Sequence, residues 1–276
     1  MPEGPEIWRS ADRLSRALKN HKTQKVFFAF DELKPYEDEL TGTRIIDVEP
    51  RGKALLTRFE NHLNIYSHNQ LYGKWYVRER GDIPDTNRKL RVAIHNDLYS
   101  AYLYSASDIE VLKDDELDEH DFLKKLGPDV LDDRVTLDQV ECRFRNRDFQ
   151  NRKLTTLLLD QEFLSGLGNY LRSEILFKAG IHPSMRPADC DDDQIRALAK
   201  ASIKMARRSY ETGGITNELE IVEALKEEGA ERSDYRFFVF NREDERCFKC
   251  GTPIKKIKSG GRRLYYCPEC QPEPEE

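Results

Sequence analysis

The chain has 276 residues, of which 38% are hydrophobic and 35% are charged, and its formal net charge is −6. This length is sufficient for one large domain or two, and the apolar fraction is sufficient for a buried core. No long apolar run is present, which excludes a transmembrane helix, and no basic start precedes an apolar segment, which argues against a secretory signal. We therefore expect a cytoplasmic protein with no membrane partner.

Charge is distributed unevenly along the chain. Residues 107–121 form an acidic run, whereas residues 143–153 and 255–263 are rich in lysine and arginine. A nucleic-acid-binding surface needs only a local basic stripe. The negative net charge therefore argues only mildly against such a partner.

The chain opens with Met1-Pro2-Glu3-Gly4-Pro5-Glu6, and a helical pattern follows at once. Apolar residues then recur at helical spacing and predict an amphipathic helix from Pro5 to about Asn20. If Met1 is removed, Pro2 becomes a free secondary amine, a nucleophile that no internal residue can supply. From these residues alone, a stiff terminus without function is the favoured interpretation.

Short β-rich runs follow the helix, separated by Gly, Asp, Asn and Pro, and they favour an antiparallel sandwich or barrel. After Gly127-Pro128-Asp129 the patterns become helical, and Tyr235–Phe240 again resembles a strand. The predicted strands cover residues 23–30, 44–48, 53–59, 63–67, 74–78, 90–95 and 98–104; the predicted helices cover 136–144, 152–164, 169–179, 191–211 and 217–228. This order predicts the α+β class.

Two cysteine pairs near the C-terminus have the spacing of a zinc ribbon. Cys247-x2-Cys250 and Cys267-x2-Cys270 are separated by 16 residues. Two disulfides are the alternative, but a cytosolic location disfavours them. Four thiolates leave no open coordination position, so we expect one structural Zn²⁺ and no organic cofactor. The ion would order the small hairpin between the two pairs.

Two segments are candidates for binding phosphate. The hairpin contains Ser259-Gly260-Gly261-Arg262-Arg263, in which two glycines form a tight turn and present an arginine. The segment from Leu164 to Arg172 contains two glycines before Asn169, a candidate N-cap for the next helix, whose exposed N–H groups favour an anion. A solvated turn and an ordinary helix connection are the respective alternatives.

Together these motifs resemble the formamidopyrimidine-DNA glycosylase and endonuclease VIII family. The Pro-Glu-Gly-Pro-Glu start, Arg51-Gly52-Lys53, the Gly-Leu-Gly-Asn-Tyr-Leu turn and the terminal zinc ribbon occur in the family's order. Gly4, Ile7 and the segment Ser67–Gly73 match the endonuclease VIII branch. The resemblance covers essentially the whole chain.

The resemblance implies a division into five parts. Residues 1–126 would form a catalytic β-sandwich and residues 127–134 a linker. A helix-two-turn-helix DNA-binding domain would span 135–240, a zinc finger 241–271 and an acidic tail 272–276. Damaged double-stranded DNA would lie between the sandwich and the helical domain.

The resemblance also assigns catalytic roles. The nucleophile would be Pro2, Glu3 would protonate the sugar ring oxygen, and Lys53 would donate a second proton and contact phosphate. Arg262 would grip the phosphate beside the lesion, and Arg263 is the equivalent if the hairpin is shifted by one residue. An α-amino group has a reference pKa of about 8, so a useful fraction of such amines is unprotonated at neutral pH.

Further residues would contact DNA or lie near the site. Gln70, Leu71 and Tyr72 match the triplet that fills the space left by the flipped base, and Asn169 would bind phosphate. Lys125 lies where close relatives carry an arginine. A lysine keeps the positive charge but cannot make the bidentate phosphate contact of an arginine. Glu6 and Glu174 match carboxylates near the site, although Glu6 also suits an ordinary first helical turn.

The predicted activity is that of a bifunctional DNA glycosylase and AP lyase of base excision repair. It would excise oxidised pyrimidines through a Schiff base on Pro2, followed by β,δ-elimination. A glycosylase for oxidised purines and a non-catalytic zinc protein that binds damaged DNA are the alternatives. We expect a monomer, associated with the nucleoid if the protein is bacterial.

Overall fold

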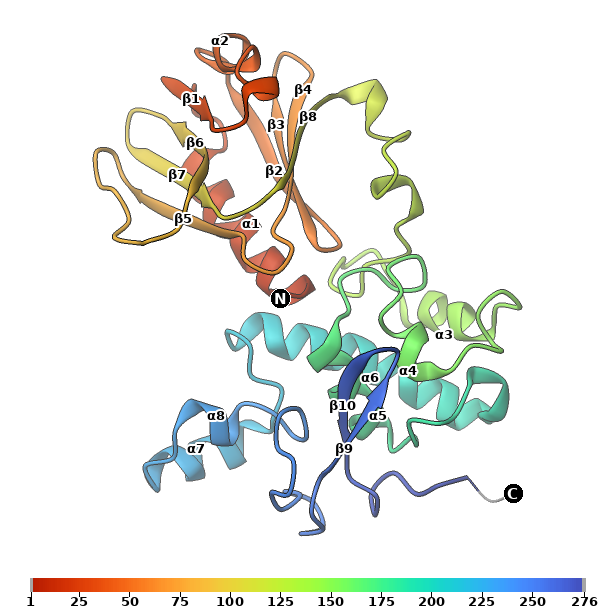
Figure 1. Ribbon diagram of the computed structural model, residues 1–276. Coiled ribbons are helices and arrows are strands. Elements are labelled where there is room, and N and C mark those ends of the chain that lie inside the picture. Colours follow the sequence, from red (N-terminus) through yellow and green to blue (C-terminus); the bar gives the residue numbers. More distant parts are fainter. Residues whose placement is uncertain (1, 275–276) are drawn as a thin grey trace. The chain divides into compact units, whose positions relative to one another are not determined.

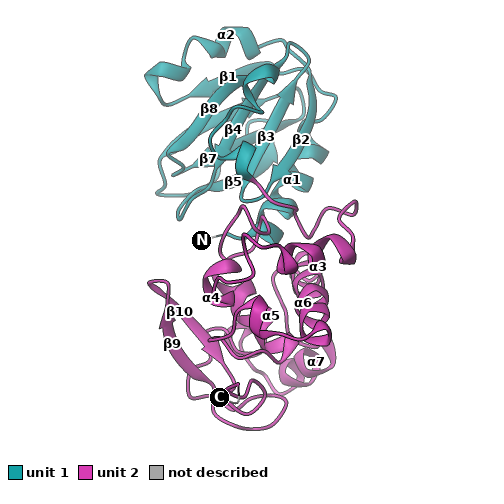
Figure 2. Ribbon diagram, turned by 90° about the vertical axis from the view of Figure 1, so that its right-hand side faces the viewer, with its two compact units in different colours: residues 1–125 teal, residues 126–276 magenta. Residues whose placement is uncertain are grey.

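The computed structural model describes residues 2–274, which divide into two compact units. Within the described residues, the first unit ends at Lys125 and the second begins at Leu126 (Figure 2). Met1 and the last two residues of the predicted acidic tail lie outside the described residues. The finer division into five parts remains a prediction.

The first unit is an antiparallel β-sandwich with a helix at its start, as the sequence predicts (Figure 1). The helix α1 spans Gly4–Leu18. One sheet has the order β1 (Lys25–Phe28), β6 (Leu90–His95), β7 (Tyr99–Tyr104), β5 (Lys74–Glu79); the other has the order β2 (Ile45–Arg51), β3 (Ala54–Phe59), β4 (Leu63–His68), β8 (Asp108–Lys113).

The core of this unit consists of α1 and the inner faces of the two sheets. Leu14 and Leu18 of α1 are buried with Phe28, Ile65 and Leu103 from the strands. The periodicity of 3.6 residues along α1 and of two along the strands places these side chains on the inward faces. Short elements complete the unit: the 3₁₀ turns Asp31–Leu33, Asp114–Glu116 and Leu123–Lys125, and the helix α2 (Tyr36–Leu40).

The strand β8 is not among the predicted strands. The acidic run that begins at residue 107 conceals an alternation in which Ile109 and Val111 are buried while Asp108 and Glu110 face outward. Pairing with β4 supplies the hydrogen bonds and the apolar surface that stabilise this strand. The run is therefore half strand and half solvated turn.

The second unit is helical and ends in a two-stranded hairpin. It contains α3 (Leu137–Arg145), α4 (Leu154–Leu157), α5 (Asn169–Ala179), the 3₁₀ turn Pro187–Asp189, α6 (Asp192–Glu211), α7 (Leu219–Glu227), α8 (Arg232–Tyr235), β9 (Lys255–Ser259) and β10 (Arg262–Tyr266). The order of sandwich, helices and zinc-ribbon hairpin confirms the predicted fold class. None of the helices within residues 2–274 is long and apolar enough to cross a bilayer.

Two predicted elements of this unit are wrong. Of the helix predicted over 152–164, only the short helix α4 forms. The side chain of Gln161 makes hydrogen bonds with the backbone of Leu159, Gly166 and Leu167, and these stabilise a non-helical turn. The strand predicted over 235–240 is absent from the described residues, because the backbone N–H groups of Phe238–Phe240 bind a side chain instead of a neighbouring strand.

Candidate active site

The start of the chain is held by the first turn of α1. Glu3 is the N-cap, and its backbone N–H donates to Glu6 Oε2 at 3.0 Å. Glu6 also accepts a hydrogen bond from Arg9 at 3.0 Å, so this carboxylate organises the helix start. The Glu3 side chain is only 3% exposed, whereas Pro2 is half-buried. The helix therefore fixes the backbone directly after Pro2.

Lys53 lies in the two-residue turn between β2 and β3. Gly52 precedes it with a φ of +58°, which a hairpin turn of this length requires and which a side chain at this position would strain. Lys53 is only 6% exposed, unusual for a lysine. Burial lowers the pKa of His68 at the end of β4; the Asp108 carboxylate opposes this shift and the Lys53 ammonium group adds to it.

The loop between β4 and β5 presents apolar side chains to solvent. Leu71 is 56% exposed and Tyr72 is 66% exposed. The backbone turns sharply here, with a φ of +47° at Gln70, and the side-chain Oε1 of Gln70 accepts a hydrogen bond from Ser107 at 2.8 Å. A Cβ at Gly73 would lie 2.6 Å from the carbonyl oxygen of Asn69, so the loop closes only around a glycine.

Lys125 is exposed at the end of the 3₁₀ turn Leu123–Lys125, the last residues of the first unit. The predicted residues thus fall into two sets. Pro2, Glu3, Lys53, the Gln70–Tyr72 triplet and Lys125 belong to the first unit, and Asn169 and the two hairpin arginines belong to the second.

Asn169 is not an N-cap, contrary to the sequence-based expectation. Gly168 is the N-cap of α5, and Asn169 is the first helical residue. Its Nδ2 donates to the carbonyl oxygen of Arg263 at 2.9 Å, and its Oδ1 accepts from Arg172 at 2.7 Å. Asn169 therefore connects the start of α5 to the hairpin instead of closing its own helix.

The hairpin of β9 and β10 turns through Gly260 and Gly261. Both glycines have positive φ, +59° and +73°, the combination of a two-residue type I′ turn. Arg262 pairs with Ser259 and Arg263 with Lys258, and both arginines are exposed. Because side chains alternate along a strand, the two guanidinium groups leave opposite faces of the hairpin.

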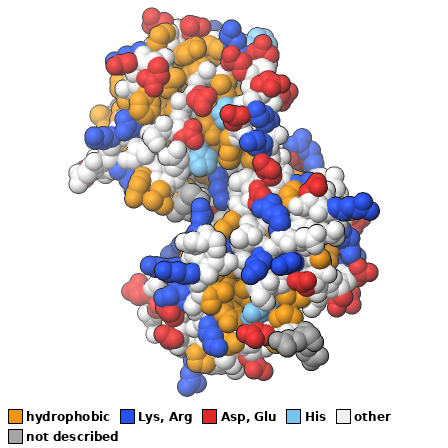
Figure 3. All heavy atoms as spheres, turned by 45° about the vertical axis from the view of Figure 1, so that its right-hand side comes forward, with side chains coloured by type: hydrophobic (Ala, Val, Ile, Leu, Met, Phe, Trp, Pro, Cys, Tyr) orange, Lys and Arg blue, Asp and Glu red, His pale blue; other side chains and the backbone are white. Residues whose placement is uncertain are grey.

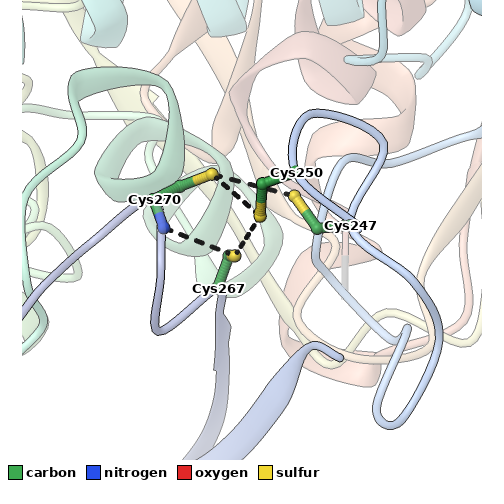
Figure 4. Close-up of side chains that lie close together, drawn as sticks. All are labelled: Cys247, Cys250, Cys267 and Cys270. Carbon is green, nitrogen blue, oxygen red and sulfur yellow. Dashed lines mark hydrogen bonds between the residues drawn. The ribbon is translucent and has the colours of Figure 1, made fainter. Parts of the chain in front are cut away.

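The four cysteines form a compact cluster in which their side chains point toward one another (Figure 4). Sulfur–sulfur distances are 3.4 Å for Cys250–Cys267, 3.5 Å for Cys250–Cys270 and 3.9 Å for Cys247–Cys270. Four thiolates at about 2.3 Å from a tetrahedral Zn²⁺ lie about 3.8 Å apart, so the donor set fits this ion. The cluster is a structural zinc site with four cysteine ligands.

Glu174 is fully buried and holds the segment after α8. Its carboxylate accepts hydrogen bonds from the backbone N–H groups of Phe238 (2.8 Å), Val239 (3.0 Å) and Phe240 (2.9 Å), and from the Thr216 hydroxyl. Burial raises the pKa of Glu174, whereas these hydrogen bonds favour the charged form. In this structure Glu174 organises backbone within the second unit.

Replacing Glu174 with alanine is expected to destabilise the second unit by about 3–5 kcal/mol, because several buried N–H groups would lose their acceptor. Urea denaturation of the zinc-loaded protein measures the change. Glu220→Ala, at an exposed position on α7, is the control and is expected to change stability by less than about 0.5 kcal/mol. Equal stability of the two variants would contradict this structural role.

Sequence reasoning missed Arg172 and Gln161. Arg172 is the only charged residue in segment 164–173. An isolated cation in an uncharged segment is the signal that could have identified it. Gln161 carries no comparable signal, since its partners are backbone groups of the adjacent turn.

Acidic and basic side chains are interspersed over the face shown in Figure 3. The net charge of −6 therefore does not create a uniformly acidic surface, and basic groups such as Lys258, Arg262 and Arg263 remain exposed.

Three family models match the chain. Residues 1–106 match the formamidopyrimidine-DNA glycosylase N-terminal domain, residues 126–220 match the formamidopyrimidine-DNA glycosylase H2TH domain, and residues 244–272 match a zinc finger found in FPG and IleRS. The fold is also that of known structures. Lactococcus lactis formamidopyrimidine DNA glycosylase bound non-covalently to DNA with an AP site is 22% identical, with a TM-score of 0.79 over 98% of this chain and 100% of that chain.

MutM in complex with DNA containing carbocyclic 8-oxo-G is 23% identical, with a TM-score of 0.79 over 99% of this chain and all of the other. Sequence relatives are much closer. Endonuclease 8 of Salmonella schwarzengrund and of Salmonella enteritidis are each 48% identical over 98% of this chain and 100% of the relative. The chain therefore belongs to the formamidopyrimidine-DNA glycosylase family, in its endonuclease 8 branch, whose members are DNA glycosylases with AP lyase activity.

Proposed function

We propose that this enzyme excises oxidised pyrimidines from double-stranded DNA and then cleaves the strand through a Schiff base on Pro2. The observation that carries this proposal is the geometry of the chain start: Pro2 directly precedes a buried carboxylate, Glu3, at the rigid first turn of a helix. A terminal amine in a fixed position beside an acid is suited to nucleophilic attack coupled to proton transfer.

The proposed reaction begins once the damaged nucleotide has been flipped out of the duplex. The Pro2 nitrogen attacks C1′ of the sugar, its N–H proton passes to the departing base, and Glu3 protonates the ring oxygen as the C1′–O4′ bond breaks. The product is an iminium ion that has no N–H proton to lose, so it stays cationic and acts as an electron sink. Loss of a C2′ proton then expels the 3′ phosphate, and a second elimination expels the 5′ phosphate.

Other residues would bind the substrate. We propose Lys53 as the proton donor in the first elimination, since it is a buried cation of the same unit. From the second unit, Asn169 and Arg262 would contact phosphates, with Arg263 as the alternative to Arg262. Lys125 would add a single-point phosphate contact, and Glu6 would support the chain start through its contacts with Glu3 and Arg9.

The exposed loop supports extrusion of the damaged nucleotide. Leu71 and Tyr72 present apolar side chains to solvent, and such side chains can occupy the space left in a base stack. The Gln70 amide can hydrogen-bond the unpaired base of the opposite strand. We propose that the protein acts as a monomer on chromosomal DNA, in the cytoplasm and at the nucleoid.

We expect a preference of at least about tenfold for thymine glycol over 8-oxoguanine when duplexes with these lesions compete for limiting enzyme, a difference of about 1.4 kcal/mol in transition-state binding. Product analysis on a denaturing gel, with the two duplexes of different length, measures both rates in one tube. An undamaged duplex is the control. A clear preference for 8-oxoguanine would replace this substrate assignment by that of an oxidised-purine glycosylase.

A further inference from the structure

Arg172 is the largest of the completely buried side chains among the described residues, with 0% exposure. It lies on α5 three residues after Asn169, so both side chains leave the same side of the helix. A guanidinium group stays protonated at physiological pH and loses its hydration when buried, so it is tolerated only where hydrogen bonds replace water. The contacts of Arg172 should therefore explain why a cation occupies this position.

The guanidinium group binds four oxygen atoms. Nη1 donates to the carbonyl oxygen of Thr155 in α4 at 2.7 Å and to that of Ser259 at the end of β9 at 3.4 Å. Nη2 donates to Asn169 Oδ1 at 2.7 Å and to the carbonyl oxygen of Arg263 in β10 at 3.1 Å. One planar group thus joins α4, the start of α5 and both strands of the hairpin.

These contacts fix the orientation of the Asn169 amide. Its Oδ1 faces a donor on Arg172, and its Nδ2 faces the carbonyl oxygen of Arg263 at 2.9 Å. Rotating the amide by 180° would place donor against donor and acceptor against acceptor. The second Nδ2 hydrogen belongs to a half-buried side chain at the start of an 11-residue helix, where the backbone also favours an anion.

The same contacts fix the hairpin. The carbonyl oxygen of Arg263 accepts from both Asn169 and Arg172, and the carbonyl oxygen of Ser259 accepts from Arg172. Ser259 is the register partner of Arg262, and its hydroxyl also donates to Thr155 Oγ1 at 2.7 Å. The backbone on both sides of the Gly260–Gly261 turn is therefore held from α4 and α5, and the direction of Arg262 depends on it.

We propose that Arg172 is a positioning residue for DNA binding: it orients the Asn169 amide and the hairpin arginine so that both meet the phosphate backbone together. This inference rests on the proposed phosphate contacts of Asn169 and Arg262. Arg172 itself, being fully buried, does not touch DNA.

The test is a double-mutant cycle on the full-length, zinc-loaded protein, using a duplex with a tetrahydrofuran abasic analogue, which is bound but not cleaved. Asn169→Ala is expected to weaken binding about tenfold. Arg172→Met is expected to weaken it at least as much, because it also releases the hairpin, and the double variant is expected to bind like Arg172→Met instead of showing the product of the two losses. Arg172→Lys keeps the charge but cannot span four acceptors, so it is expected to resemble Arg172→Met. The affinity loss of Arg172→Met is expected to exceed any loss in its single-turnover rate at saturating lesion duplex, because the residue acts on phosphate binding.

Arg242 offers a matched control, because it is also buried and donates to the carbonyl oxygens of Phe238 and Arg246 without contacting Asn169 or the hairpin turn. Arg242→Met is expected to bind within about twofold of wild type. Zinc content and thermal denaturation show which variants are folded, and if Arg172→Met unfolds, the cycle is completed with Arg172→Lys.

Four outcomes would overturn the proposal. Wild-type affinity of Arg172→Met beside a weakened Asn169→Ala would show that Arg172 does not position the amide, and additive losses would show that the residues act independently. Wild-type affinity of Arg172→Lys would show that charge alone matters. If Asn169→Ala itself binds like wild type, the phosphate contact assigned to Asn169 under the proposed function fails, and the positioning role fails with it.

Discussion

A form of the protein with one or more residues ahead of Pro2 is expected to lose strand cleavage and base excision by more than about a thousandfold while binding duplex DNA normally. An extension converts the secondary amine into an amide, whose nitrogen lone pair is delocalised and cannot attack C1′. Single-turnover cleavage of a thymine glycol duplex and affinity for the abasic-analogue duplex measure the two properties separately.

The same extension placed after the C-terminus is the matched control, because residues 272–274 are exposed. That protein is expected to cleave at the wild-type rate. Mass spectrometry must first confirm that Met1 is removed from the wild-type protein and that the extension is retained in the variant. Cleavage by the N-terminally extended form at the wild-type rate would mean that the nucleophile is another residue.

Removal of the zinc ion is expected to weaken DNA binding by more than about a hundredfold. Structural zinc contributes about 10–16 kcal/mol to the folding of zinc-finger peptides, and the hairpin has only two five-residue strands of its own. Without the ion, the four cysteines are no longer linked to one another and no longer stabilise the backbone that carries Arg262 and Arg263. Binding is measured before and after chelation, with metal content determined on the same samples.

Cys267→Ser and Cys190→Ser form a matched pair for this experiment. Cys267 belongs to the cluster of four thiols, whereas Cys190 lies outside it. Only Cys267→Ser is expected to lose zinc and DNA affinity, and re-addition of zinc is expected to restore the chelated wild type but not this variant. Full affinity in metal-free protein would show that the hairpin folds without its ion.

Much of the fold could be predicted because its signals are local. The apolar stripe from Ile7 to Leu18 specifies α1, and short β-rich runs bounded by turn residues specify strands such as β3 and β7. The glycine pair at 260–261 specifies a hairpin turn, and the cysteine spacing specifies the metal site. Each pattern lies within one continuous segment of the chain.

The errors arose where distant residues decide the local structure. The aromatic segment 235–240 has strand-like composition, but Glu174, more than 60 residues earlier, binds its N–H groups. The acidic residues of β8 concealed its two buried apolar positions until β4 supplied a partner. Propensity yields to tertiary contacts in both segments.

The candidate site was accessible from the sequence only in part. Motifs identified Pro2, Glu3 and Lys53, but the burial of Glu3 and Lys53 depends on how the sandwich packs around them. Similarly, Asn169 was recognised as a polar residue at a helix start, whereas its hydrogen bond to Arg263 joins residues 94 positions apart. The motifs indicate candidate residues, and the structure shows which contacts hold them.

The most direct test of this account is borohydride trapping of wild-type enzyme on a duplex that contains thymine glycol or an abasic site. Reduction of the iminium ion is expected to yield a stable one-to-one protein–DNA adduct, and peptide mapping is expected to place the sugar remnant on the nitrogen of Pro2. Absence of an adduct from zinc-loaded protein with a processed N-terminus, or an adduct on Lys53 instead, would contradict the proposed mechanism.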